Sequence, residues 1–157
     1  MNIRRATVED AATLASLCHH VQDIHIQARP DIYRPFDDAM LLAEMQSRME
    51  SDDMFAFIGE VDGRPIGYVM LVLIDRPASL YHCAQRRIEI DQISIDPDHR
   101  SHGYGEALIY RAFEYAKSLN IDHVTLGVLA FNVDAIRFYE RLGFSMLSHK
   151  MEIEISD

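Results

Sequence analysis

Apolar residues recur at intervals of three and four positions in four stretches of the chain, and this spacing is typical of amphipathic helices. Residues that favour helix caps precede two of them: Thr7 stands before the first, and Asp37 and Asp38 before the second. Gly143 ends the last, as glycine often does after a helix. The predicted helices cover residues 8–25, the segment with Leu41, Leu42, Met45 and Met49, residues 103–119 and residues 132–142.

Apolar runs between these helices predict strands. Asp62-Gly63 joins two of them, and this dipeptide suits the turn of a two-residue β-hairpin. Beyond Gly143 the chain alternates at Met151, Ile153 and Ile155, which predicts a final strand or hairpin. The predicted strands cover residues 2–6, 54–61, 64–75, 87–96, 123–130 and, for the most part, 144–155.

One predicted strand, residues 87–96, changes the phase of its alternation. Its apolar positions alternate at Ile88 and Ile90 and again at Ile93 and Ile95, so the pattern slips by one residue between the two pairs. One inserted residue turns every later side chain to the opposite face of a sheet. The slip therefore predicts a β-bulge between Ile90 and Ile93.

The order of the predicted elements is β-α-α-β-β-β-α-β-α-β, without internal repeats, low-complexity tracts or linkers. Helices and strands mixed in this way predict one α/β (α+β) domain over residues 1–157, built on a mixed sheet. A chain of 157 residues is long enough to bury a core without a disulfide or a structural metal.

The chain carries 15 basic and 25 acidic residues, a formal net charge of −10. An acidic surface disfavours nucleic acid and anionic membranes as partners, although a few local donors can still bind an anionic ligand. The longest apolar run, residues 68–74, is too short to cross a bilayer, and the N-terminus lacks a signal-peptide core. Cys18 and Cys83 match no zinc or disulfide pattern. These features predict a soluble, cytoplasmic protein that holds no metal.

Residues 93–108 combine a strand, a turn, a Gly-x-Gly pair and the start of a helix. A helix N-terminus offers unpaired N–H groups and a positive dipole end, and Gly103 and Gly105 let an anion approach closely. Arg100 and His102 can add positive charge. Leu108 stands where the dinucleotide fingerprint needs a third glycine. The segment predicts an anion cradle suited to a pyrophosphate; the alternative is a helix that simply begins with glycines.

The predicted helix over residues 132–142 carries a second chemical pattern. Asn132 and Tyr139 lie within about 20° of each other around its axis, because seven residues turn the helix by ~700°. Ala135 lies between them and is small enough for a thin ligand to pass. The stripe predicts a groove that ends in a proton donor; the alternative is an amphipathic helix whose tyrosine is a core aromatic.

Together the two segments resemble the GCN5-related N-acetyltransferase (GNAT) superfamily. The resemblance rests on Arg100-x-x-Gly103-x-Gly105 and on Asn132-x-x-Ala135-x-x-Phe138-Tyr139-x-x-x-Gly143-Phe144, and the order of elements agrees over nearly the whole chain. It implies a mostly antiparallel central sheet with helices on both faces. It also implies that acetyl-CoA is the co-substrate and that the acetyl group moves directly to a primary amine of a small molecule or peptide.

The resemblance also implies which residues contact acetyl-CoA. The strand backbone at the bulge pairs with the two amides of pantetheine, and the helix start surrounds the pyrophosphate. A backbone N–H of Ile93 or Ser94 stabilises the oxyanion, and Tyr139 donates a proton to the thiolate. The implied contacts are Ile93, Ser94, Ile95, Arg100, Ser101, His102, Gly103, Tyr104, Gly105, Glu106, Asn132, Ala135 and Phe138.

The acceptor amine needs a base, because a free alkyl amine has a pKa near ~10 and is mostly protonated at neutral pH. Glu89 and Asp91 occupy alternate positions of the strand that leads into the bulge, so they share a face. By the resemblance, Glu89 stands where histone-acetylating members carry their catalytic glutamate, and Asp91 is the second candidate. Alternatively, both acids face solvent or pair with Arg86 and Arg87.

Two positions depart from parts of the superfamily. Gly127 replaces an acid found in members that acetylate protein N-termini, which argues against a ribosomal-protein substrate. His102 stands where arginine or lysine is more usual, so phosphate binding is expected to weaken as the pH rises past the titration of this histidine.

Residues 25–35 resemble a segment between the first two helices of some bacterial acetyltransferases, a region that forms the acceptor-side wall. His25, Arg29, Asp31 and Tyr33 are therefore candidate substrate contacts. The alternative is an ordered loop held by a contact between Arg29 and Asp31.

The main hypothesis is an acetyl-CoA-dependent N-acetyltransferase. The alternatives are a CoA-binding regulator without transfer activity and an interaction module that binds no CoA. The excess of acid favours a cationic acceptor such as a polyamine, an aminoglycoside or a lysine side chain. The final strand can pair within the sheet or with a second copy of the chain, so a homodimer stays open.

Overall fold

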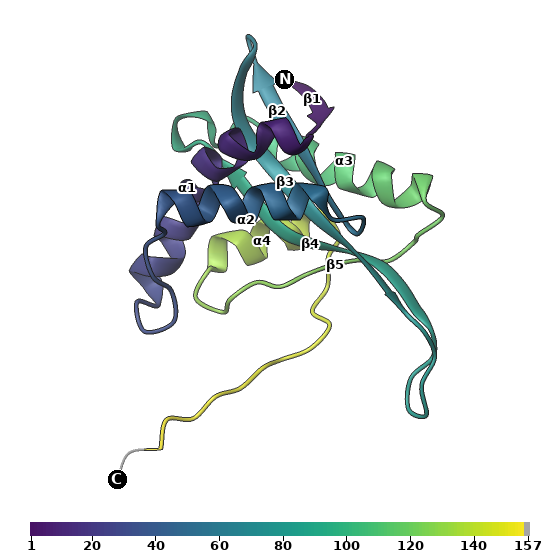
Figure 1. Ribbon diagram of the computed structural model, residues 1–157. Helices are drawn as coiled ribbons and strands as arrows, with labels where there is room; N and C mark the ends of the chain where they lie inside the picture. Colours follow the sequence, from purple (N-terminus) through teal and green to yellow (C-terminus); the bar gives the residue numbers. More distant parts are fainter. Residues whose placement is uncertain (156–157) are drawn as a thin grey trace. The chain divides into compact units, whose positions relative to one another are not determined.

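Residues 1–155 are described by a computed structural model, in which the chain forms two compact units, residues 1–127 and the residues from 128 onward. Within the described residues, the first unit holds a five-stranded sheet and three α-helices, and the second holds one α-helix (Figure 1). The elements are β1 (Asn2–Arg5), a 3-10 turn (Val8–Asp10), α1 (Ala11–Ala28), α2 (Asp38–Glu50), β2 (Met54–Val61), β3 (Arg64–Arg76), β4 (Gln85–Ile95), a second 3-10 turn (Pro97–His99), α3 (Tyr104–Ser118), β5 (Val124–Leu126) and α4 (Val133–Arg141).

The five strands lie in the order β1-β2-β3-β4-β5. Each neighbouring pair is antiparallel except β4 and β5, which run parallel. The expected mixed, mostly antiparallel sheet is therefore confirmed. The predicted hairpin turn is present between β2 and β3, where Asp62 and Gly63 both have positive φ, at 51° and 75°.

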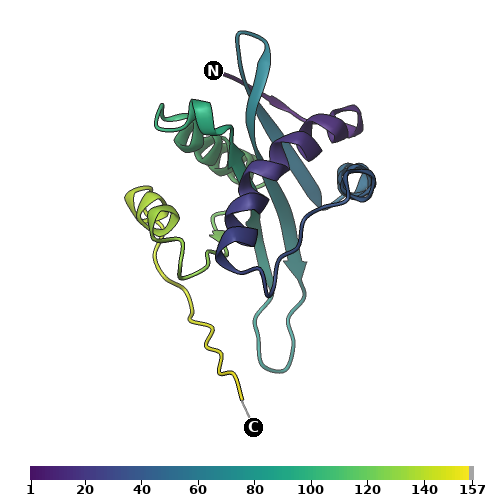
Figure 2. The ribbon, with the colours of Figure 1, turned by 90° about the vertical axis from the view of Figure 1, so that its left-hand side faces the viewer.

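Helices cover both faces of this sheet. On one face Ile58 of β2 is buried in a core cluster with Leu14 of α1 and Met45 of α2. The preceding residue, Phe57, points to the other face, where its ring lies 5.3 Å from that of Tyr115 on α3. Figure 2 shows α3 on one side of the sheet and α1 and α2 on the other. The expectation of helices on both faces is confirmed.

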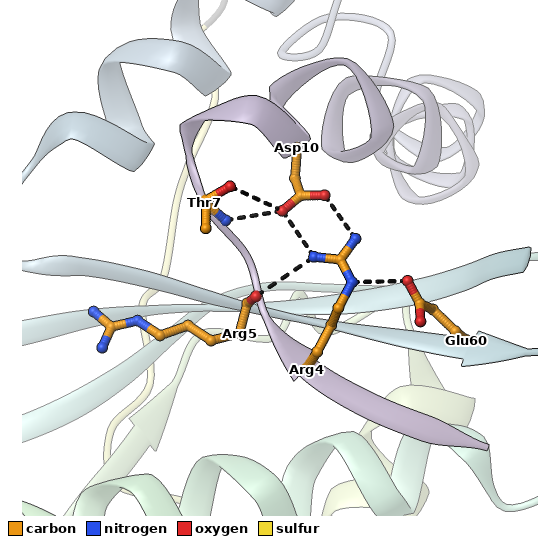
Figure 3. Close-up of polar contacts among 5 residues, drawn as sticks. All are labelled: Arg4, Arg5, Thr7, Asp10 and Glu60. Carbon is orange, nitrogen blue, oxygen red and sulfur yellow. Dashed lines mark hydrogen bonds and ion pairs between the residues drawn. The ribbon is translucent and has the colours of Figure 1, made fainter. Parts of the chain in front are cut away.

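A charged network joins β1 to β2 and to the start of α1 (Figure 3). Arg4 donates from Nε to Glu60 Oε1 at 2.8 Å and from its two terminal nitrogens to the Asp10 carboxylate at 2.8 and 2.7 Å. Asp10 also accepts a bond from the backbone N–H of Thr7 at 2.9 Å. Hydrogen bonds from Arg4 lower the pKa of Asp10, so this carboxylate stays ionised and paired at neutral pH.

Two elements have bounds that differ from the predicted ones, each for a structural reason. The predicted helix over residues 8–25 begins as a 3-10 turn and then continues to Ala28, where Arg29 and Pro30 end it. The predicted strand over residues 123–130 is paired only over Val124–Leu126. Its partner β4 carries its extra residue directly after Ile90, and a bulge interrupts the ladder of a neighbouring strand.

The predicted final strand or hairpin is wrong for the described residues 144–155, which form no helix or strand. Met151, Ile153 and Ile155 are 85–92% exposed. Alternation of side chains stabilises a strand only when a neighbouring strand pairs with its backbone, and no strand pairs with this segment over its described length. Over residues 1–155, no helix is both long enough and apolar enough to cross a membrane.

Candidate functional site

The candidate site begins at the bulge of β4, where the predicted slip is confirmed. Leu71 of β3 pairs with Ile90, and the preceding residue, Met70, pairs with Gln92. Asp91 is therefore the extra residue of the bulge. Ser94 and its neighbours pair with β3 on one side, but β5 pairs with β4 only as far as Ile90. On the β5 side, the described part of β5 thus gives no partner to the backbone of Ile93–Ile95.

Side chains after the bulge attach β4 to α1 and β3. Ser94 is buried and donates from Oγ to the carbonyl oxygen of Leu17 at 2.8 Å. The side-chain oxygen of Gln92 accepts bonds from the Tyr68 hydroxyl at 2.8 Å and from the Cys18 thiol at 3.8 Å. Burial raises the pKa of both the Cys18 thiol and the Tyr68 phenol, so both are neutral donors at physiological pH. This packing holds the part of β4 that extends beyond its pairing with β5.

The two candidate bases have different partners. Asp91 accepts a bond on Oδ2 from Arg48 of α2 at 2.6 Å, and 34% of its side chain is exposed. Glu89 lies 3.5 Å from Arg87 on its own strand, and 42% of its side chain is exposed. Both acids lie on the face of the sheet that α1 and α2 cover, since Glu89 pairs with Val72, two positions along β3 from the core residue Met70. Glu89 thus makes an ion pair with a neighbouring arginine of its own strand, whereas Asp91 pairs with an arginine of α2.

A tight connection leads from β4 to α3. The Asp96 side chain accepts a bond from the Asp98 N–H at 3.0 Å and caps the 3-10 turn. Arg100 folds back, so that its Nε donates to the carbonyl oxygen of Ile95 at 3.2 Å. His102 lies with Nδ1 2.6 Å from the carbonyl oxygen of Arg100. These contacts shape the turn and hold the Arg100 and His102 side chains beside it.

The N-terminus of α3 supplies the backbone donors that an anion cradle needs. Gly103 caps the helix in the left-handed conformation, with φ of 79°, and its carbonyl accepts the first helical bond, from the N–H of Ala107. The N–H groups of Tyr104, Gly105 and Glu106 precede that bond, so they have no acceptor within the helix. Ser101, His102, Gly103 and Glu106 are exposed. The expected cradle geometry is present in this segment.

Substituting alanine for Gly103 should lower the free energy of unfolding by about 1 kcal/mol, because a left-handed φ disfavours a residue with a Cβ. A Cβ on Gly103 would have no atom within 4 Å, so the cost comes from the backbone alone. Urea denaturation of the wild type and of Gly103→Ala measures it. Gly103→Asn serves as the control, since asparagine tolerates this conformation better; equal losses for alanine and asparagine would contradict the explanation.

The second unit holds the other predicted cofactor residues on α4. Asn132 is the helix cap, and its Oδ1 accepts a bond from the Ala135 N–H at 3.2 Å. The ring of Tyr139 lies 5.2 Å from that of Phe138 and 5.7 Å from that of Phe144. Burial raises the pKa of Tyr139 to about 12. The helix ends as predicted, with Gly143 at a φ of 92°.

The predicted acceptor-side residues lie in the last turn of α1 and in the segment that follows it. The rings of His25 and Tyr33 stack at 4.9 Å, and burial lowers the pKa of His25. Arg29 forms an ion pair with Asp31 at 2.8 Å. The structure thus brings His25 and Tyr33 together, while Arg29 makes the contact that the ordered-loop alternative expects.

Arg48 is the residue at this site that sequence analysis missed. It follows Leu41 by seven residues on α2, so the two side chains lie within about 20° around the helix axis. A cation on the apolar face of a helix could have indicated an acidic partner for Arg48. Within residues 1–155, no group of three or more histidine, cysteine, aspartate or glutamate side chains is placed to hold a metal.

Comparisons with known proteins agree with this arrangement. Residues 18–144 match the sequence model of the Acetyltransferase (GNAT) family. The uncharacterized N-acetyltransferase MJ1207 of Methanocaldococcus jannaschii is 37% identical over 119 residues, which cover 71% of this chain and 51% of that protein. This chain spans about half the length of the curated relatives it matches, 40–60% for the first three.

Solved structures share the fold. The tetramutant of the BH1408 protein of Bacillus halodurans superposes with a TM-score of 0.92 at 25% identity, covering 99% of this chain and 100% of that one. The aminoglycoside N-acetyltransferase AAC(6')-Iy in complex with CoA has a TM-score of 0.72 at 16% identity, covering 98% and 93%. At that identity the second likeness concerns the fold alone.

Proposed function

The chain belongs to the acetyltransferase (GNAT) family, and from this membership we propose that it transfers an acetyl group from acetyl-CoA directly to the primary amine of a small molecule or peptide. The observation that carries the proposal is the bulge of β4 followed at once by the N-terminus of α3. Together they offer an extended backbone edge and then a cluster of N–H donors.

This pairing of edge and cradle suits acetyl-CoA. The pantetheine arm carries two amides, which match the donors and acceptors of the β4 edge at Ile93–Ile95, where β5 no longer pairs and where Arg100 would have to release the Ile95 carbonyl oxygen. The pyrophosphate is an anion, which suits the N–H groups of Tyr104, Gly105 and Glu106 at the positive end of the α3 dipole. Because the chain carries a net charge of −10, these local donors have to hold the anion against the overall field.

We assign proton removal to Glu89. Its carboxylate accepts one proton from the ammonium group of the acceptor, directly or through water, and the neutral amine then attacks the acetyl carbonyl carbon. The N–H of Ile93 or Ser94 donates to the oxyanion that forms. As the C–N bond forms and the C–S bond breaks, Tyr139 donates its phenolic proton to the sulfur. The nitrogen loses two protons in all: the first passes through Glu89 to solvent, and the second reprotonates Tyr139.

The acceptor is proposed to be cationic. Acidic residues outnumber basic ones by 25 to 15, and a negative field raises the local concentration of a cationic substrate. His25 in the last turn of α1 and Tyr33 after it, whose rings stack, are the proposed acceptor contacts. Polyamines, aminoglycosides and lysine side chains all carry the amine that this chemistry needs.

The proposal is tested in two steps on the full chain. Acetyl-CoA at 100 times its Kd should stabilise the protein by about 2.7 kcal/mol and raise Tm by roughly 5–10 °C. Release of free CoA thiol is then followed with spermidine, kanamycin and a lysine-containing peptide. A thermal shift without thiol release from any amine would indicate a CoA-binding regulator, and the absence of any shift would indicate an interaction module.

Replacing Tyr139 with phenylalanine should lower kcat about 100-fold, near the low end of general-acid catalysis, because a thiolate is already a good leaving group. The KM for acetyl-CoA should change little. Since the pKa of Tyr139 is raised to about 12, its proton is retained at pH 10, and the wild-type kcat should not fall there through loss of this donor.

Steady-state thiol release across pH measures both effects. Tyr110→Phe is the matched control, because Tyr110 lies half-exposed on α3 and has no proposed role. Full turnover by Tyr139→Phe with the preferred amine would show that Tyr139 is not the acid.

A further inference from the structure

Arg48 links α2 to the bulge of β4 and makes the shortest contact at either candidate base. Its Nη1 donates to Asp91 Oδ2 at 2.6 Å. Three quarters of the Arg48 side chain is buried, as is about two thirds of that of Asp91. A charge-assisted bond between partly buried groups is stronger and more directional than a surface ion pair.

Further contacts hold the Arg48 guanidinium in place. Its Nε donates to Glu44 Oε1 at 2.7 Å, one turn earlier on α2, and Nη1 also lies 3.6 Å from the sulfur of Met70 on β3. A planar guanidinium bound at two of its nitrogens has little freedom to rotate. Arg48 therefore presents its charge to Asp91 in one orientation.

The polar side chains that follow Asp91 on this face of β4 are also engaged. Gln92 accepts bonds from Tyr68 and Cys18, and Ser94 donates to Leu17. Asp91 thus belongs to a series of contacts that attach the bulge to α1, α2 and β3. Glu89 differs, since its contact is a 3.5 Å pair with Arg87 of its own strand, which attaches it to no other element.

We propose that Arg48 is a positioning residue that holds the Asp91 carboxylate as an anchor of the bulge and thereby leaves proton removal to Glu89. Protonation would remove the negative charge of Asp91 and so weaken its charge-assisted bond to Arg48. The assignment rests on the proposed acetyl transfer. It separates two acids that lie two residues apart and that sequence alone does not distinguish.

The test uses the amine that the wild type acetylates with the highest kcat/KM. Glu89→Gln removes the proposed base. In that background Arg48→Met removes the partner of the Asp91 carboxylate, which can then act as a base. The kcat/KM of E89Q/R48M should therefore exceed that of E89Q by about tenfold or more. Its pH profile should also show a new fall in kcat/KM toward acidic pH (an acid limb), as Asp91 becomes protonated. E89Q/R48K should stay at the E89Q level, because lysine keeps a cation beside Asp91. Equal activity of E89Q and E89Q/R48M would overturn the proposal.

A second measurement does not depend on the stability of the Arg48 variants. Asp91→Asn leaves Arg48 paired with Glu44, and it should keep the acid limb of the wild-type pH profile, whereas Glu89→Gln should lose it. Loss of that limb in Asp91→Asn would make Asp91 the base and overturn the proposal. The groups that face the two acids are Arg48 and Glu44 of α2, Arg87 of β4, Cys18 of α1 and Tyr68 of β3.

A control variant completes the experiment. Glu114→Gln removes an acid that pairs with Arg111 on α3 and has no proposed role, so its activity should match that of the wild type. If the wild type releases no thiol with any amine of the panel, the proposed acetyl transfer itself fails. If the wild type is active and Asp91→Asn loses the acid limb, only the role of Arg48 fails.

Discussion

Replacing Glu89 with glutamine should lower kcat/KM for the acceptor amine by about 100- to 10,000-fold, the range that a general base contributes. Glutamine keeps the size of the side chain but takes up no proton at neutral pH. The amine would then have to lose its proton to water, and most of it is an ammonium ion at pH 7. Thiol release under saturating acetyl-CoA measures the loss.

The pH dependence of kcat/KM shows whether Glu89 acts as a base. A base acts only when ionised, so the wild-type kcat/KM should fall as the pH drops through the titration of Glu89, and Glu89→Gln should lack that limb. Asp75→Asn is the matched control, because Asp75 lies on the same hairpin and pairs with Arg86 at 3.5 Å, the distance between Glu89 and Arg87. A loss below tenfold for Glu89→Gln, or an equal loss for Asp75→Asn, would contradict the assignment.

Replacing Gly67 with alanine should lower the free energy of unfolding by about 1–3 kcal/mol, as overpacking of a core does, and weaken binding of acetyl-CoA as well. A Cβ on Gly67 would lie 2.6 Å from the carbonyl oxygen of Ser94 and 2.5 Å from Cδ1 of Ile95. The carbonyl is backbone and cannot turn away, so β3 and β4 would have to separate. The segment displaced is the one proposed to contact pantetheine.

Gly59 offers a close control for this experiment, since it pairs directly with Gly67 across β2 and β3. A Cβ there would lie 2.7 Å from the sulfur of Met1, whose flexible and partly exposed side chain can move aside. Urea denaturation and acetyl-CoA titration of both variants separate the two cases. Equal stability losses, or unchanged acetyl-CoA affinity in Gly67→Ala, would contradict the explanation.

Local patterns carried most of the prediction of the fold. The bulge at Asp91 was predictable because a change of phase in a period of two is visible within ten residues. The turn at Asp62-Gly63, the cap at Asp37 and the helix end at Gly143 were equally accessible, since each depends on the conformation of a few consecutive residues.

Pairing between distant segments was less accessible. Residues 144–155 alternate as a strand would, yet no strand pairs with the described segment. The strand predicted over residues 123–130 pairs over only three residues, because the bulge of its partner β4 interrupts the pairing after Ile90. Alternation reports which side chains could share a face, but not whether another backbone is available to pair.

The candidate site divides along the same line. Residue types and spacing were enough to propose the anion cradle, the groove between Asn132 and Tyr139 and the two acids of β4, because each lies within one short segment. The partner of Asp91 is Arg48, 43 residues away in the chain. The residues next to Asp91 or Arg48 in the sequence do not predict that the two side chains meet. Only the packing of α2 against the sheet lets the Arg48 side chain reach Asp91 at 2.6 Å, and that contact is what distinguishes Asp91 from Glu89.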